Sequence, residues 1–175
     1  MSDAHVLTMV VEIPQGSRNK YEIDHDTGEV FLDRVLFTAT RYPADYGFIP
    51  NTLAEDGDPL DAMVLITEPT FPGVRIRIRP IGLFLMEDQG KADHKVLGVP
   101  IKDPRWKDTQ SLDALPPHLL REMEHFFRVY KDLEDAKTAV IGWRGLDETL
   151  AVIEAAHRAF QGAGGPGGPG GHGPA

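Results

Sequence analysis

The chain has no cysteine in its 175 residues, and aromatic side chains make up only 8% of them. Without thiols it can form no disulfide framework, no thiolate metal site and no cysteine nucleophile. Basic residues are also scarce, because 18 Lys and Arg face 27 Asp and Glu, which gives a net charge of -9. This charge disfavours nucleic acids and anionic membranes as partners. No apolar run approaches the ~18 residues of a transmembrane helix, and no signal peptide begins the chain, so we expect a cytoplasmic protein.

Glycine and proline dominate the last residues, 162–175. Such a composition cannot bury enough apolar surface to order itself, so we expect a disordered Gly/Pro-rich tail there. The glycines resemble a dinucleotide-binding pattern, but that motif needs a strand before it and a helix after it. The remaining residues, 1–161, are enough for one domain with one core.

Short β-branched or alternating segments predict many strands. They are Val6–Ile13, Lys20–Asp24, Val30–Leu36, Met63–Ile66, Val74–Ile78, Ile81–Met86, Val96–Val99 and Ala139–Trp143. His25–Gly28 predicts the turn of a hairpin. Helical spacing follows Pro116 and Pro117 as far as Tyr130, and again from Leu146 to Phe160. We therefore expect an α+β fold, with the strands curled into a small closed β-barrel and flanking helices.

Three arginines, Arg75, Arg77 and Arg79, alternate with apolar residues along one predicted strand. This stripe could bind phosphate or nucleic acid, but we favour a solvated strand face.

The segment Asp56–Asp61 holds three carboxylates within six residues, together with one glycine and one proline. Such a loop presents hard oxygens to a hard cation. It does not fit an EF-hand, because the fifth, sixth and twelfth positions hold Leu60, Asp61 and Thr67. An acidic surface turn is the alternative.

A second acidic group, Asp88 with Asp93, follows a predicted strand, and Lys95 comes two residues later. Carboxylates that converge need cations to stay ionised, and Mg2+ provides charge while keeping waters. Lys and Arg side chains orient phosphates, and Tyr hydroxyls can do so without adding charge. Acids together with such donors predict a metal-phosphate site. The further candidates are Glu12, Glu22, Lys20, Arg34, Tyr42, Tyr46, Tyr130 and Lys131.

These residues stand in seven motifs, and the motifs and their order along the chain resemble family I soluble inorganic pyrophosphatases of the prokaryotic type. The resemblance covers nearly all of Val6–Phe160. The motifs are Glu12-Ile13-Pro14, Asn19–Asp24, Asp33-Arg34, Tyr42–Gly47, Asp56–Asp61, Asp88–Lys95 and His125–Glu134. The resemblance implies hydrolysis of pyrophosphate to two phosphates, Mg2+ as the cofactor, an OB-like barrel, and a homo-oligomer, commonly a hexamer.

The resemblance also implies roles for individual residues. Asp58 resembles the base that activates the attacking water, so that no covalent enzyme intermediate forms. Tyr42 is expected to line the cavity. The implied direct metal ligands are Asp56, Asp61, Asp88 and Asp93, with Glu12 and Glu22 at a further, substrate-associated metal. The groups expected to hold phosphates or organise the site are Lys20, Arg34, Tyr46, Lys95, Tyr130 and Lys131.

Three positions add to this pattern or depart from it. Gln89 stands where many relatives carry a second acid after the residue matching Asp88, which affects the tuning of the outer metal. His25 and His94 could be metal ligands, but in an extended segment His94 points away from Asp93 and Lys95, which favours an indirect or interface role.

Two rival functions remain. Another metal-dependent phosphohydrolase could use the same ligands, although few aromatics are available for a base-stacking pocket. An OB-type nucleic-acid-binding module is the other, and the charge of -9 argues against it.

Overall fold

The structure is a computed structural model, and it describes residues 5–164. Its strands are β1 (Leu7–Ile13), β2 (Asn19–Ile23), β3 (Val30–Val35), β4 (Asp45–Phe48), β5 (Asp61–Val64), β6 (Arg75–Asp88), β7 (Lys91–Ala92), β8 (Lys95–Pro100) and β9 (Thr138–Arg144). The helices are α1 (Pro117–Val129) and α2 (Leu146–Gly162), with short 3-10 turns at Pro104–Trp106 and Leu112–Ala114. In residues 5–164 no helix has the length and apolarity to cross a bilayer.

Seven strands form one sheet, and β2 and β3 form a separate hairpin. In the large sheet the hydrogen-bonded order is β1, β4, β5, β8, β6, β7, with β9 also paired to β6. β1 pairs with both β4 and β6, so the pairing of five strands leads back to β1. Only β5 and β8 are parallel to each other. The predicted α+β class is confirmed.

Most predicted strands are present, with shifted ends. The two segments expected at Val74–Ile78 and Ile81–Met86 are one strand, β6, which continues through Pro80 with a change of register between Pro80 and Gly82. Proline donates no hydrogen bond, and such irregularities are where a sheet accommodates it. Strands β4 and β7 were not predicted, because β7 has only two residues and β4 includes Asp45 and Gly47, residue types that are depleted in strands.

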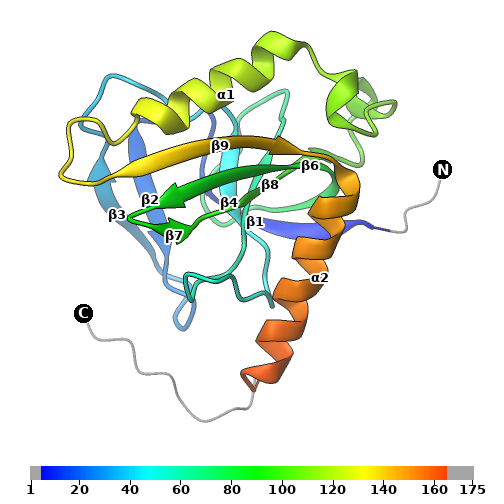
Figure 1. Cartoon of the computed structure of the whole chain (residues 1–175), viewed down its shortest axis with the longest axis horizontal. Coiled ribbons are helices and arrows are strands. Elements are labelled where there is room, and N and C mark those ends of the chain that lie inside the picture. The colour runs from blue at the N-terminus through cyan, green and yellow to red at the C-terminus, as the bar shows by residue number, and fades with distance from the viewer. Residues whose placement is uncertain (1–4, 165–175) are drawn as a thin grey trace.

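Both helices were predicted, and they cover different parts of the sheet. α1 lies along β9, and α2 leaves from the end of β9 (Figure 1). The apolar side of α1 buries Met123, Phe126 and Phe127 in a cluster that includes Phe84 of β6. α2 buries Ile153 and Ala156 in a second cluster. α2 runs through Gly162, whereas residues 165–175, most of the predicted disordered tail, lie outside the described residues.

The arginine stripe on β6 divides into two parts. Arg75 and Arg77 are exposed, as expected of a solvated face. Arg79 is half-buried and donates hydrogen bonds to the carbonyls of Trp106 and Thr109. It therefore holds the segment before α1 against the sheet.

Candidate active site

One cavity of about 530 Å³ collects nearly all the predicted site residues. Its walls come from β1, the β2–β3 hairpin, β4, the loop before β5, the end of β6 and the end of α1. Of the residues predicted from the sequence, Glu12, Lys20, Glu22, Arg34, Tyr42, Tyr46, Asp56, Asp58, Asp61, Asp88, Asp93, Tyr130 and Lys131 line it. Lys95 does not line the cavity.

Glu12 reaches the cavity through a β-bulge. In the pairing of β1 with β4, Val11 lies opposite Gly47 and Ile13 opposite Tyr46, so Glu12 is the extra residue. Bulges redirect side chains, and they are common beside active sites. The Ile23 amide donates to Glu12 Oε2 at 2.9 Å, which ties β1 to the hairpin. Burial raises the pKa of the Glu12 carboxyl to about 7, despite this hydrogen bond.

The acidic loop presents Asp56, Asp58 and Asp61 on one side of the cavity. Gly57 has φ 90, a left-handed conformation that suits glycine. The Asp58 amide donates to Asp56 Oδ1 at 3.1 Å, and the Ala54 amide donates to the Asp58 carbonyl at 2.8 Å. Burial, followed by repulsion from Asp93 and Asp58, raises the pKa of Asp56. The loop is thus ordered by its own backbone while its carboxylates crowd together.

Lys95 lies beneath the acids and is 1% exposed. In the parallel pair β5–β8 it stands opposite Asp61. Its Nζ donates to Asp61 Oδ2 at 3.0 Å and to the Tyr46 hydroxyl at 2.8 Å, and it lies 3.1 Å from Asp93 Oδ2. Burial alone would lower the pKa of Lys95, but the two carboxylates outweigh burial and raise it. Lys95 therefore stays charged and holds Asp61 and Asp93 together.

Asp88 and Asp93 flank the short β7 hairpin. Lys131 Nζ binds Asp88 Oδ2 at 2.6 Å. The other oxygen, Asp88 Oδ1, is buried and has no hydrogen-bond partner in the described part of the chain. Burial raises the pKa of Asp93, with Lys95 opposing the shift and Asp61 adding to it. Asp88 thus retains an acceptor oxygen that no residue in the described part of the chain fills.

The β2–β3 hairpin contributes two cations, Lys20 and Arg34, to the cavity. Lys20 Nζ contacts Glu22 Oε1 at 2.6 Å and Asp33 Oδ2 at 3.2 Å. Asp33 is itself a bulge residue, because Lys20 pairs with Arg34 and Tyr21 with Leu32. The same Asp33 oxygen binds Arg34 Nη1 at 2.5 Å. Burial of Asp33 opposes ionisation, but Lys20 and Arg34 lower the pKa of its carboxyl overall.

The sequence motifs did not predict a role for Asp33 or Glu134, although both residues stand within the seven motifs. Glu134 Oε1 lies 3.0 Å from Arg34 Nε, across 100 residues of chain. Carboxylates next to candidate phosphate-binding cations were a signal in the sequence at both positions. The contacts of Asp33 depend on a β-bulge, and that of Glu134 depends on a residue far away in the sequence. The local sequence pattern encodes neither.

The tyrosines form an aromatic wall with Phe126 and Phe127. Burial raises the pKa values of Tyr42, Tyr46 and Tyr130 above the ordinary value, so all three stay neutral at pH 7. The Tyr46 hydroxyl donates to Asp61 Oδ2 at 2.7 Å. Tyr46 therefore acts on a carboxylate of the acidic loop while also lining the cavity.

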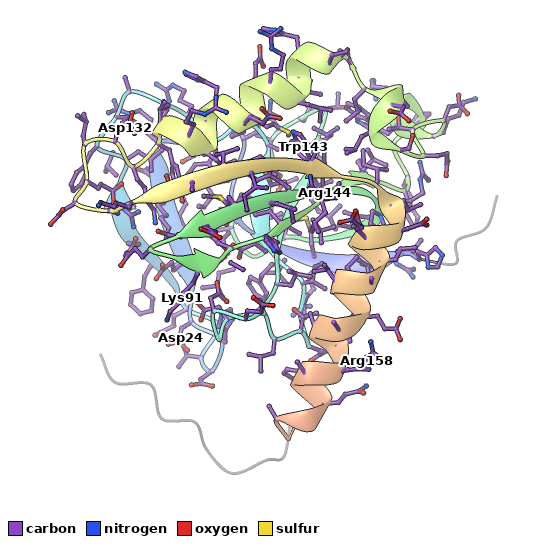
Figure 2. The ribbon with its side chains drawn as sticks, in the orientation of Figure 1. Asp24, Lys91, Asp132, Trp143, Arg144 and Arg158 are labelled. Carbon is purple, nitrogen blue, oxygen red and sulfur yellow. The ribbon has the colours of Figure 1, made fainter. Side chains whose placement is uncertain are left out.

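The two histidines differ in position. His25 lines the cavity, and its ring packs edge-on against Phe48 with centroids 4.7 Å apart. His94 is not among the lining residues. Gln89 has φ 51 and lines an adjoining cavity of about 320 Å³ together with Asp56, Asp58, Asp88, Lys91, Ala92 and Asp93. Figure 2 places Lys91 near the pointed end of β6.

The donor set fits hard divalent cations. The cavity gathers carboxylates from three segments far apart in the sequence, with raised pKa values at Glu12, Asp56 and Asp93 and an unpaired oxygen on Asp88. Mg2+ and Ca2+ prefer such oxygens. Within residues 5–164 no three acidic or histidine side chains are already arranged around one point at metal distance. Lysines occupy part of the space between the acids.

Comparisons with known proteins agree with this site. The model of the family described as inorganic pyrophosphatase matches residues 9–161. The inorganic pyrophosphatase of Leifsonia xyli is 51% identical over 157 residues, which are 89% of this chain and 96% of that protein. The Nostoc enzyme is 50% identical over 156 residues, covering 89% and 92%. The crystal structure of inorganic pyrophosphatase from Thermus thermophilus superimposes with a TM-score of 0.88 at 46% identity, covering 92% and 94% of the two chains. The chain therefore belongs to the inorganic pyrophosphatase family, as its motifs predicted, and is a hydrolase.

Proposed function

We propose that the chain hydrolyses inorganic pyrophosphate to two phosphates in an Mg2+-dependent reaction with no covalent enzyme intermediate. The observation that carries the proposal is a single cavity lined both by clustered carboxylates and by the phosphate-binding cations Lys20, Arg34 and Lys131. Phosphoryl transfer needs mainly positioning and charge stabilisation, and this arrangement supplies both once metal ions balance the acids.

Asp56, Asp61, Asp88 and Asp93 would hold Mg2+, with Glu12 and Glu22 at a further metal that arrives with the substrate. Bound Mg2+ would neutralise substrate charge and lower the pKa of a nearby water. Lys95 supports this ligand set from beneath, because its ammonium group fixes Asp61 and Asp93. We therefore assign Lys95 to the organisation of the metal ligands and not to direct contact with substrate.

Asp58 would act as the base. Its carboxylate receives no hydrogen bond in the described part of the chain, whereas Asp61 already accepts from Tyr46 and Lys95. A free carboxylate beside the attack position can take the proton of a water as the water oxygen bonds to one phosphorus. The bridging P–O bond breaks, and the second phosphate leaves with the electron pair.

Lys20, Arg34, Tyr130 and Lys131 would bind the phosphates and stabilise the charge on the leaving group. Lys20, Arg34 and Lys131 are held by Asp33, Glu134 or Asp88, so substrate meets them already oriented. Tyr46 and Tyr42 complete the wall without adding charge.

The broader expectations form part of this proposal. The five-strand pairing that leads back to β1 supports an OB-like closed barrel flanked by the helices. We further propose a cytoplasmic location and a homo-oligomer, a hexamer by family resemblance. An interface between subunits is supported by the exposed apolar side chains around β3, which are Val30, Phe31, Leu32, Val35 and Phe37. Binding to nucleic acid or membranes is not part of the proposal.

The test compares Asp58→Asn with Asp61→Asn. Asp58→Asn deletes the base, so we expect turnover to fall roughly 10²- to 10⁴-fold with near-normal metal binding. Asp61→Asn should instead weaken the apparent Mg2+ affinity, and excess Mg2+ should restore part of its activity. If excess Mg2+ restored Asp58→Asn equally, Asp58 would be a ligand and the proton transfer would be misassigned. Release of phosphate from ATP as fast as from pyrophosphate would favour the rival phosphohydrolase.

A further inference from the structure

We propose that Glu134 is a positioning residue that orients Arg34 toward the substrate phosphate. The inference rests on the proposed phosphate-binding role of Arg34. It adds that this role depends on Glu134, which lies far from Arg34 in the sequence. Glu134 is not among the residues that line the cavity, so it would act through Arg34 and not on substrate.

Two carboxylates hold the Arg34 guanidinium at different atoms. Glu134 Oε1 lies 3.0 Å from Nε as an ion pair without an aligned hydrogen bond, and Asp33 Oδ2 lies 2.5 Å from Nη1. In the described part of the chain, the Nη2 donors have no hydrogen-bond partner. Because the guanidinium is planar and rigid, contacts at both Nε and Nη1 restrict where Nη2 can point. Arg34 lines the cavity, so Glu134 helps to hold its guanidinium at the cavity wall.

The burial of Glu134 gives its ion pair with Arg34 a desolvation cost. Its side chain is 12% exposed, against 32% for Asp33, and its second oxygen is buried without a hydrogen-bond partner among the described residues. A carboxylate taken out of water is unfavourable unless a cation compensates it. Arg34 is the cation that an ion pair joins to Glu134, so each side chain restricts the position of the other.

The turn after α1 links this pair to a second phosphate-binding cation. The Glu134 amide donates to the Lys131 carbonyl at 2.9 Å, and the Asp132 amide donates to that of Val129 at 3.0 Å. The turn leads from α1 to β9 at the side of the molecule where β3 lies (Figure 1). Lys131 extends from the same turn to Asp88. One backbone turn therefore carries both Lys131 and the carboxylate that contacts Arg34.

Asp33 alone would leave Arg34 poorly placed. It is adjacent to Arg34 in sequence and also binds Lys20, and its carboxylate competes with phosphate for Nη1. Without the charge of Glu134, the Arg34 side chain gains freedom to follow Asp33 away from the substrate. The expected effect is weaker substrate binding with most of the catalytic step retained.

The experiment is a double-mutant cycle on Mg2+-supported pyrophosphate hydrolysis with Glu134→Gln, Arg34→Ala and the double variant. We expect Glu134→Gln to lower kcat/KM roughly 5- to 30-fold, mostly through KM, and to have almost no further effect when Arg34 is already Ala. Asp132→Asn is the matched control, since it removes an exposed carboxylate from the same turn without an ion pair to Arg34; Figure 2 marks Asp132 there. It should behave like the parent chain. If Glu134→Gln does not fold, Glu134→Asp replaces it in the cycle, because it keeps the charge but withdraws it from Nε.

The outcomes separate this inference from the proposed function. An Arg34→Ala variant with parental kcat/KM would overturn the phosphate-binding role of Arg34. An impaired Arg34→Ala beside an unimpaired Glu134 variant would overturn the positioning role alone. An equal loss from the Glu134 change in both backgrounds would also overturn it, because Glu134 would then act by a route other than Arg34.

Discussion

Replacement of Lys95 by Met tests whether this buried ammonium organises the metal-binding acids. The change keeps the length and apolar stem of the side chain but removes the charge that contacts Asp61, Asp93 and the Tyr46 hydroxyl at 3.0, 3.1 and 2.8 Å. Breaking a buried ion pair by removing one partner costs ~3–5 kcal/mol. Because Asp61 and Asp93 side chains are 23% and 15% exposed, water can compensate part of this loss. We expect a loss of about 3 kcal/mol in the free energy of unfolding.

The sign of the pH dependence follows from Asp93. Burial already raises the pKa of this carboxyl, and loss of Lys95 would raise it further. The penalty should therefore be full at pH 8, where Asp93 must be ionised, and should shrink as the pH falls and the carboxyl takes up a proton. Added Mg2+ should recover part of the loss at pH 8 by supplying the missing positive charge.

The assay is urea denaturation followed by circular dichroism, in EDTA at pH 8 and pH 5 and in Mg2+ at pH 8. Lys91→Met is the matched control, because Lys91 is an exposed lysine four residues earlier in β7. If Lys95→Met were no less stable than Lys91→Met in EDTA at pH 8, Lys95 would not hold the acids together, and its assigned role would be wrong.

Three further predictions concern the metal, the end of the chain and Glu12. EDTA should abolish phosphate release from pyrophosphate and added Mg2+ should restore it, and full activity in excess chelator would contradict the proposed mechanism. A chain that ends at Gly164 should keep the parental activity in an enzyme assay and the parental melting temperature in calorimetry. A clear drop in either would show that residues 165–175 contribute to stability or activity. Glu12 holds its proton up to about pH 7 in the folded chain, against 4.5 for the free group, so stability without metal should fall as the pH rises between these values. Glu12→Gln, which does not titrate, should then be more stable than the parent in EDTA at pH 8 by about 2–3 kcal/mol, with little difference at pH 4.5; equal urea midpoints at both pH values would argue against a buried, protonated Glu12.

Local sequence patterns were sufficient to predict the fold class and much of the secondary structure. The helices at 117–129 and 146–162 follow from apolar spacing, because one face of each helix must be buried. Proline at the start of the first helix also marks its beginning. The hairpin between β2 and β3 follows from Gly28, which adopts φ 76 in the turn. The merging of two predicted strands into β6 could not be predicted, because Pro80 reads as a break unless the neighbouring strand changes register there.

The chemistry of the site was also determined by the sequence, since the clustered acids at 56–61 and 88–93 require cations wherever they lie. Only the tertiary structure decided which of these groups line the cavity and which hold the lining residues in place. The parallel pairing of β5 with β8 places Lys95 opposite Asp61 and buries it, which makes it a support for the acids and not part of the cavity wall. A bulge turns Glu12 into the cavity, another places Asp33 against Lys20 and Arg34, and the turn after α1 places Glu134 against Arg34. These contacts join residues far apart in the chain, and burial sets their strength, so neither can be read from local spacing.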